Sequence, residues 1–306
     1  MKIEDMSKKE EPIMVAIHCL VYNHEPYLRD CLEGFVKQQT NFRFVAIAHD
    51  DCSTDGSAAI IQEYAEKYPE IFRPIYETEN LWSKHEALID RLMLDAIKDL
   101  GCKYVAMCEG DDYWTDSLKL QKQVDFLETH PDFSLCFHRV KCLMCATGEL
   151  TDEYMVRDMP GKSTIVDLSH GNYIHTPSVM FRWSDRFCEK RKTMGECQPG
   201  DYVIWMLNAE NGKIWKMEEP MAIYRVGSGV WGEKDTIKNN LFTLCTLSKL
   251  YTVIEDKQAK EGLHEQITYY RDFIGEYVDG SIQKMQKSKA YRLGKAILKP
   301  FKWLKR

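Results

Sequence analysis

The chain has 306 residues, of which 44% are hydrophobic, so it is long enough to bury a substantial core. Its net charge of -6 argues against nucleic acid as the main partner. It has eleven cysteines, an odd number, no apolar N-terminal leader, and no run of ~18 apolar residues that could cross a membrane, so we expect a cytoplasmic protein with reduced thiols.

Strand-like and helix-like patterns alternate through the first third of the chain. Short apolar runs rich in β-branched residues predict strands, and apolar residues three or four positions apart predict helices between them. The predicted strands are 13–23, 42–51, 72–77 and 103–109, and the helices are 24–39, 53–69 and 88–101. This order predicts an α/β fold with a mostly parallel sheet flanked by helices.

The pattern changes after residue 133. Segments 134–146 and 178–183 resemble strands, but regular crossover helices are not evident between them. Glycine, proline and aromatic residues are frequent up to residue 231, which indicates a less regular second half built onto the same sheet. Helical patterns return at 236–255 and 263–278.

Polar residues gather where three predicted strands end. They are Tyr22 and Asn23 after the first strand, Asp50 and Asp51 at the end of the second, and Glu109, Gly110, Asp111 and Asp112 after the fourth. Ligands of open α/β sheets bind beyond the carboxyl ends of the strands, so we expect one crevice here. Three carboxylates within four residues repel one another, which predicts a bound cation. Mg²⁺ or Mn²⁺ would suit, because hard cations prefer carboxylate and phosphate oxygens.

Several blocks of sequence carry a resemblance to a known family. They are VAIHCLVYNHEPYLRDCLEGFVKQQ, VAIAHDDCSTDGSAAII, KYVAMCEGDDYWTDSLKLQKQVDFLETHPDFSLCFH, HTPSVMFRW and GDYVIWMLNAENGKIWKMEEPMAIYRVGSGVW. In this order they resemble the family 2 glycosyltransferases with the GT-A fold, over residues 12–232. The resemblance implies a GT-A catalytic domain at 1–232, with a nucleotide-binding half at 12–133 and an acceptor half at 134–232. A helical C-terminal region would follow at 233–306.

The resemblance implies roles on the nucleotide side of the crevice. Tyr22 and Asn23 match the loop that lies along uracil and ribose, and Asp51 matches the carboxylate that accepts the N3–H of the base. A cap on the following helix is the alternative for Asp51. Asp111 matches a contact to the ribose or to a metal-bound water, and Asp112 matches the metal ligand. Glu109 is a candidate first acid of an E-x-D variant.

On the acceptor side, Asp201 matches the catalytic base of the family, although Asp after Gly is also a helix-cap signal. His175 is a candidate acceptor-side residue. Arg225 is open to two roles, a contact to the diphosphate or a structural ion pair. The family often has His two residues after the arginine of its YRxH pattern, and this chain has Gly227 there, which puts the strength of metal binding in doubt.

The C-terminal segment from Lys284 to Arg306 contains nine Lys and Arg residues and no Asp or Glu, which leaves -15 on the rest of the chain. Aromatic and aliphatic residues alternate with these cations. Such a segment is typical of peripheral contact with an anionic membrane, here the inner face of the cell membrane. A solvated helix docked on the acidic body is the alternative.

Three functions compete at this stage. The leading one is a metal-assisted, inverting glycosyltransferase that moves a sugar from a nucleotide sugar, UDP-linked by preference, to a glycan or lipid-linked acceptor in surface polysaccharide synthesis such as lipopolysaccharide. The second is a nucleotide-binding scaffold on the membrane with a degenerate site. The third is a nucleotidyltransferase, which usually has a Gly-rich phosphate loop near the first strand, and VYNHEPYLRD has no glycine.

Overall fold

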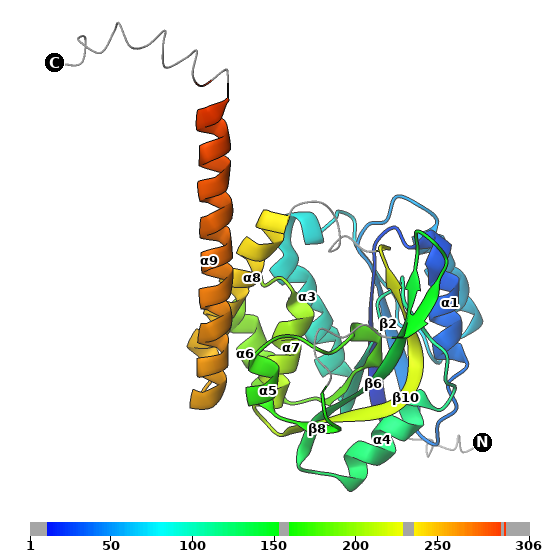
Figure 1. Ribbon diagram of the computed structural model, residues 1–306. Helices are drawn as coiled ribbons and strands as arrows, with labels where there is room; N and C mark the ends of the chain where they lie inside the picture. The colour runs from blue at the N-terminus through cyan, green and yellow to red at the C-terminus, as the bar shows by residue number, and fades with distance from the viewer. Residues whose placement is uncertain (1–10, 153–158, 229–235, 289–290, 292–306) are drawn as a thin grey trace, which may run out of the picture.

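The computed structural model describes residues 11–152, 159–228, 236–288 and 291. A mixed sheet with helices on both faces forms the body, and a long C-terminal helix stands at its side (Figure 1). In chain order the strands are β1 (Ile13–Val21), β2 (Arg43–Asp50), β3 (Ile75–Tyr76), β4 (Tyr104–Met107), β5 (Tyr113–Trp114), β6 (Phe133–Met144), β7 (Leu150–Asp152), β8 (Lys162–Ser163), β9 (Met180–Arg182) and β10 (Lys213–Val226).

The helices confirm the alternation that the first third of the sequence predicts. They are α1 (Glu25–Val36), α2 (Ser57–Lys67), α3 (Trp82–Leu100), α4 (Lys119–Thr129), α5 (Ile165–Ser169), the 3₁₀ turn η1 (Thr176–Ser178), α6 (Asp185–Met194), α7 (Gly200–Ala209), α8 (Thr236–Val253) and α9 (Lys257–Lys287). Helix α3 begins six residues before the predicted start, at Trp82.

The sheet order is β3-β2-β1-β4-β9-β6-β10-β5, with β7 paired to β6 and β8 to β10. Strands β3, β2, β1 and β4 are parallel, as predicted. The next strand, β9, is antiparallel to both β4 and β6, and β6 is parallel to β10. The two halves of the chain therefore share one sheet.

Both faces of the central strands are buried, which explains their continuous apolar sequences. On β2, Ala46 and Ala48 face a core formed with α1, α2 and α4, whereas Ile47 faces a second core formed with α3 and α5 to α8. The second half is more regular than expected. It contributes α5, α6 and α7 to this second core, and β10 runs for 14 residues along β6.

Candidate active site

The loops after β1 and β2 are tied together at the predicted nucleotide-binding edge. The Asn23 side chain accepts hydrogen bonds from the Thr54 N–H (2.8 Å) and hydroxyl (3.2 Å), and Ser53 Oγ accepts from the Asn23 N–H (2.9 Å). Asn23 has a φ of 56°, a left-handed conformation that asparagine tolerates better than most residues. Beside it, the Tyr22 side chain is open to solvent.

Asp51 lies at the end of β2 and binds the start of α3. Its Oδ1 accepts from the Leu81 N–H (2.7 Å) and its Oδ2 from the Trp82 N–H (3.0 Å). Asp51 therefore caps α3. The sequence suggested a cap on α2, the first helix after Asp51 in the chain. A carboxylate has about four acceptor sites, so this cap leaves capacity for a ligand N–H. Burial raises the pKa of Asp51, and the two backbone N–H groups oppose that rise.

The acidic loop after β4 packs closely against β1 and α1. The Gly110 N–H donates to Leu20 O (3.0 Å), and a Cβ added at Gly110 would lie 2.8 Å from His24 Nδ1 and 2.9 Å from Val21 Cγ2. Only glycine fits this position without displacing its neighbours. The Asp112 N–H donates to Glu109 O (3.0 Å), which closes a tight turn and brings the three acids to one side of the sheet.

The end of β10 holds the two aspartates of this loop. Strand β5 follows the loop at once and pairs antiparallel with β10 through Ala222 and Ile223. As a result the Arg225 N–H donates to Asp112 Oδ1 (2.7 Å), and the Ser228 hydroxyl donates to Asp111 Oδ2 (2.8 Å). The other Asp111 oxygen, Oδ1, is buried and has no hydrogen-bond partner in the described part of the chain.

The Arg225 guanidinium lies beneath the acidic loop. It donates to Asp111 O (2.6 Å) and forms an ion pair with Asp30 Oδ2 (2.5 Å). It also lies 4.9 Å from the ring centre of Tyr27 and 4.6 Å from that of Tyr113. With its donors engaged by protein groups and its side chain buried, Arg225 has the contacts of a structural ion pair, one of the two roles that the sequence left open.

Asp201 is placed by the first turn of α7. Its Oδ2 is within reach of Asn172 Nδ2 (3.4 Å) and the Thr176 hydroxyl (3.5 Å), long contacts to the segment that leads into η1. Burial raises the pKa of Asp201, and hydrogen bonds from Tyr202, Asn172 and Thr176 oppose the rise.

Tyr224 joins the two acidic groups. Burial, followed by the charges of Asp112, Glu109, Asp201 and Asp111, raises the pKa of the Tyr224 hydroxyl. Its ring packs against His175, with ring centres 4.7 Å apart. Burial lowers the pKa of His175 to about 4, so this imidazole is neutral at physiological pH. The sequence analysis assigned Tyr224 no role.

Glu109 belongs to the acidic loop, and it is exposed. Desolvation, followed by the charges of Asp111 and Asp201, raises the pKa of Glu109 to about 8. Burial and the charge of Asp111 likewise raise the pKa of Asp112 well above its usual range. Glu109, Asp111, Asp112 and Asp201 therefore form one electrostatically coupled site.

A buried clamp on α4 holds η1 near Asp201. Lys119 has no exposed surface, donates to Gln123 Oε1 (2.7 Å) and lies 4.1 Å from the ring centre of Trp114. Trp114 Nε1 donates to Pro177 O (2.9 Å), and Gln123 Nε2 donates to Ser178 O (2.9 Å). The two bonds anchor the turn that carries the Thr176 hydroxyl toward Asp201.

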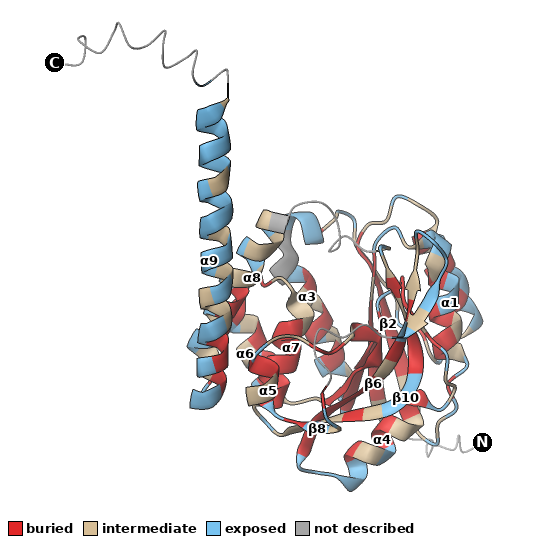
Figure 2. Ribbon diagram, viewed as in Figure 1, coloured by how far each residue is buried: buried red, intermediate tan, exposed pale blue. Residues whose placement is uncertain are grey.

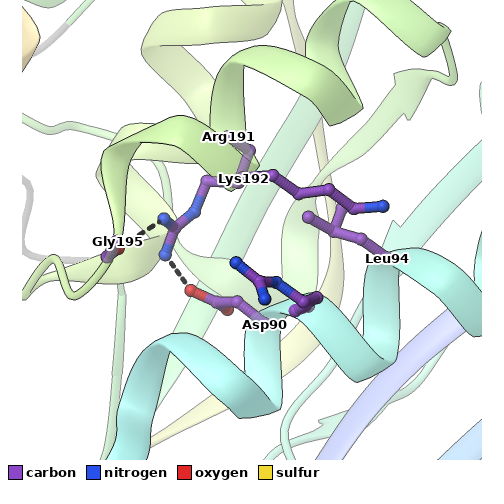
Figure 3. A pocket seen from close by; sticks show the side chains of 6 residues that line it. Asp90, Leu94, Arg191, Lys192 and Gly195 are labelled. Atoms are coloured by element: carbon purple, nitrogen blue, oxygen red, sulfur yellow. Dashed lines mark hydrogen bonds and ion pairs between the residues drawn. The ribbon is translucent and has the colours of Figure 1, made fainter.

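A small hollow lies between α3 and α6 (Figure 3). Arg191 bridges it, with an ion pair to Asp90 and a hydrogen bond to Gly195 O (2.9 Å). Its volume is about 10 Å³, which is room for one water molecule at most. We interpret it as a helix junction.

Comparisons with known proteins show the family of the chain. The family model for glycosyl transferase family 2 matches residues 17–185, more than half of the chain. This chain belongs to glycosyltransferase family 2. It is 33% identical over 221 residues, 70% of this chain and 79% of the relative, to the putative teichuronic acid biosynthesis glycosyltransferase TuaG of Bacillus subtilis. It is also 35% identical to an uncharacterized Mycobacterium tuberculosis protein, Rv1520, over 83% of this chain and 72% of the relative.

Solved structures show that this family 2 glycosyltransferase has the GT-A fold. S. aureus TarS in complex with UDP-GlcNAc is similar with a TM-score of 0.61 and 15% identity, over 84% of this chain and 71% of TarS. The mannosyltransferase PcManGT of Pyrobaculum calidifontis, solved with GDP-Man and Mn²⁺, has a TM-score of 0.55 and 14% identity, over 94% of this chain and 87% of PcManGT.

The acidic loop of the glycosyltransferase suits a divalent cation held partly by its substrate. Asp111 Oδ1 is a buried acceptor without a partner among the described residues, and Asp112 and Glu109 have raised pKa values. Mg²⁺ commonly binds one or two carboxylates and completes its shell with water and phosphate oxygens. Within the described residues no three His, Cys, Asp or Glu side chains are arranged to hold an ion by themselves.

Proposed function

We propose that this glycosyltransferase moves a sugar, with inversion, from a UDP-linked donor to a hydroxyl of a glycan or lipid-linked acceptor. The observation that carries the proposal is the facing pair of acidic groups. Asp112 accepts a hydrogen bond from the Arg225 N–H, next to Tyr224, and Asp201 contacts the Thr176 hydroxyl, next to His175. The rings of Tyr224 and His175 pack together between the two groups, with centres 4.7 Å apart. One group suits the leaving diphosphate and the other suits the incoming hydroxyl.

The chemistry assigns each residue a task. The acceptor oxygen attacks the anomeric carbon as the bond from that carbon to the diphosphate oxygen breaks, and Asp201 takes the hydroxyl proton. The leaving diphosphate gains negative charge, which a divalent cation held at Asp112 would offset. Asp111 positions the ribose, while Tyr22, Asn23 and Asp51 hold the base. His175, neutral and packed on Tyr224, lines the acceptor side.

The relatives support the substrate class. The TarS structure contains UDP-GlcNAc, and the PcManGT structure contains GDP-Man and Mn²⁺. TuaG is named for teichuronic acid biosynthesis, which supports a surface polysaccharide as the product. We favour uracil because the family resemblance matches Asp51 to the acceptor of the uracil N3–H, and Asp51 keeps acceptor capacity after capping α3.

The same proposal places the enzyme at the inner face of the cell membrane, where a lipid-linked acceptor is found. No helix among the described residues is long and apolar enough to cross a membrane. The basic segment from Lys284 onward lies mostly outside the described residues. Its nine cations would bind an anionic surface by charge, so removal of 289–306 should abolish binding to vesicles that contain phosphatidylglycerol.

Thermal unfolding with UDP, GDP, CDP or ADP, with and without Mn²⁺, tests the donor site. A ligand that binds the folded state raises the melting temperature with its occupancy. At about 100 times its Kd, UDP with Mn²⁺ should stabilise the protein by about 2.7 kcal/mol. The Asp112→Asn variant should lose the Mn²⁺-dependent part of the rise. The Asp132→Asn variant, changed at an exposed acid at the start of β6, should keep it.

Each result decides between the candidate functions. A rise in melting temperature with GDP alone would identify GDP, and not UDP, as the nucleotide of the donor. Nucleotide binding without release of UDP from any UDP-sugar, in the presence of glycan acceptors, would favour the scaffold. Release of pyrophosphate from a nucleoside triphosphate would favour a nucleotidyltransferase. No shift with any nucleotide, in folded protein, would contradict the donor site itself.

A further inference from the structure

Helix α9 has two parts with different surroundings. Its first part packs on the body, where Ala259, Gly262 and Leu263 are buried, and its C-terminal part beyond Tyr270 is mostly exposed (Figures 1 and 2). Helices α8 and α9 both follow the segment that the family model matches, 17–185. The buried part of this C-terminal region joins the second core, next to α5 and α7.

Helix α9 packs tightly against the end of α5. A Cβ built at Gly262 would collide with Ser169 Oγ and lie 3.1 Å from Ser169 Cβ, so a larger residue would force the two helices apart. Four residues further along α9, Gln266 Nε2 donates to Ser169 O. These contacts fix the C-terminal end of α5. Asn172, three residues beyond that end, reaches Asp201 Oδ2 (3.4 Å).

The same amide group of α9 also holds α7. Gln266 Nε2 donates to the Tyr202 hydroxyl (3.1 Å), and that hydroxyl donates to Leu168 O on α5 (2.8 Å). The Tyr202 N–H donates to Asp201 Oδ1 (2.6 Å). Tyr202 is therefore anchored through its side chain, and its backbone orients the neighbouring carboxylate.

Helix α8 holds the segment that leads into α7. The Thr246 side chain is buried, and its hydroxyl donates to Gln198 O (2.9 Å), two residues before α7 begins. Lys249, three residues later on α8, donates to Glu196 O. The Asp201 turn, residues 198–202, is thus held at one end by α8 and at the other by α9.

We propose that α8 and α9 position Asp201 for catalysis, with Thr246 and Gln266 as positioning residues. The direct contacts to Asp201 Oδ2 are 3.4 and 3.5 Å long, too long to fix a carboxylate by themselves. The placement of the backbone turn therefore decides where the base lies. A base must lie within hydrogen-bond reach of the hydroxyl, and a displacement of about 1 Å can cost about 10²-fold in rate.

The inference rests on the proposed role of Asp201 as the base. It goes beyond that role, because it makes the C-terminal helices part of the active site rather than an appendage to the catalytic domain.

Hydrogen exchange of the full chain, measured by mass spectrometry, tests the contact directly. Gln266→Met keeps the length of the side chain and removes its N–H donors. The backbone amides of 198–207 should then exchange about 10-fold faster or more, while those of β1 and β2 stay unchanged. The matched control is Gln283→Met, at an exposed residue of the same helix, which should exchange like the wild type.

A pair of glycine variants tests the packing of α9 on α5. Gly262→Val should push α9 away from Ser169 and also speed exchange at 198–207. Gly275→Val makes the same change in the exposed part of the helix, where a Cβ meets nothing within 4 Å, and should leave exchange at 198–207 as it is in the wild type.

Kinetics separate positioning from a general loss of structure. Release of UDP from UDP-glucose, UDP-galactose and UDP-GlcNAc is measured with water as the acceptor. Gln266→Met should lower kcat by about 10-fold and keep KM for the UDP-sugar within about two-fold. In the Asp201→Asn background the same substitution should change kcat by less than about two-fold, because the base that it positions is already lost.

The outcomes separate this inference from the proposed function. Unchanged exchange at 198–207 in both Gln266→Met and Gly262→Val would overturn it, as would equal losses of kcat from Gln266→Met with and without Asp201→Asn. A normal kcat for Gln266→Met beside an impaired Asp201→Asn would contradict only the positioning role. A normal kcat for Asp201→Asn would contradict the base itself, and this inference with it.

Discussion

Lys119 is the most unusual single residue of the protein, because its ammonium group is buried and no carboxylate in the described part of the chain bonds to it. Burial lowers its pKa from 10.5 to about 7. Between those two values the unfolded chain binds a proton that the folded protein does not, so stability rises with pH across this window. Below pH 7 the folded state carries the full cost of a buried charge.

This gives a pH-dependent prediction for Lys119→Met, which keeps the volume and removes the charge. The variant should gain melting temperature relative to wild type below pH 7, and the gain should shrink steadily toward pH 10. Thermal unfolding at several pH values measures it. Lys37→Met, at an exposed lysine on the C-terminal end of α1, should show no such trend. A difference that does not vary with pH would mean that Lys119 has the same pKa in the folded and unfolded states.

Asp201 carries the second prediction at the scale of single residues. A base must be deprotonated, so activity should fall as pH falls through the pKa of Asp201, which burial raises above that of an ordinary aspartate. Asp201→Asn should lower kcat by about 10² to 10⁴, the usual contribution of a general base, and should leave the UDP-induced melting shift unchanged. A variant with near-normal kcat would exclude Asp201 as the base.

At the scale of elements, the cap on α3 separates two roles of Asp51. Asp51→Ala should lower the free energy of unfolding by about 1–2 kcal/mol even without nucleotide, because it removes the acceptor for two backbone N–H groups. Urea unfolding measures this loss. Glu79→Ala, in the loop that leads into α3 and in an exposed ion pair with Lys84, should cost less than about 0.5 kcal/mol. If Asp51→Ala keeps its stability but binds UDP more weakly, Asp51 contacts the base and does not stabilise α3.

The sequence was most informative where structure is local. Periodicity located β1, β2, β4 and their helices, and the residues at the ends of these strands proved to be neighbours. Tyr224 escaped notice because its place depends on the pairing of β5 with β10, more than 100 residues apart along the chain. Lys119 was missed for a similar reason. A lysine near the start of a helix is predicted to be exposed unless the packing of Trp114 and Gln123 around it is known.

At the scale of the whole molecule, the second half was harder to predict because its regularity comes from tertiary contacts. Helix α7 is buried on nearly all sides, so it lacks the amphipathic stripe by which helices are recognised. Strand β10 contains Pro220 and a register shift opposite β6, which interrupt the alternation expected of a strand. The domain boundary near residue 232 stays a prediction.

The contact between α9 and α7 has a mechanical consequence. Gln266 donates to the hydroxyl of Tyr202, the residue that follows Asp201, so the first part of the long helix contacts the turn that holds the proposed base. A rotation of α9 about Gln266 would move the Asp201 turn only slightly. It would move the C-terminal end of the helix much further, because that end lies about 30 Å from Gln266 at 1.5 Å per residue. Over that length, a tilt of about 5° at the root moves the far end by about 2–3 Å. A spectroscopic label near Met285 would therefore magnify small movements of the Asp201 turn into a signal that is easy to follow.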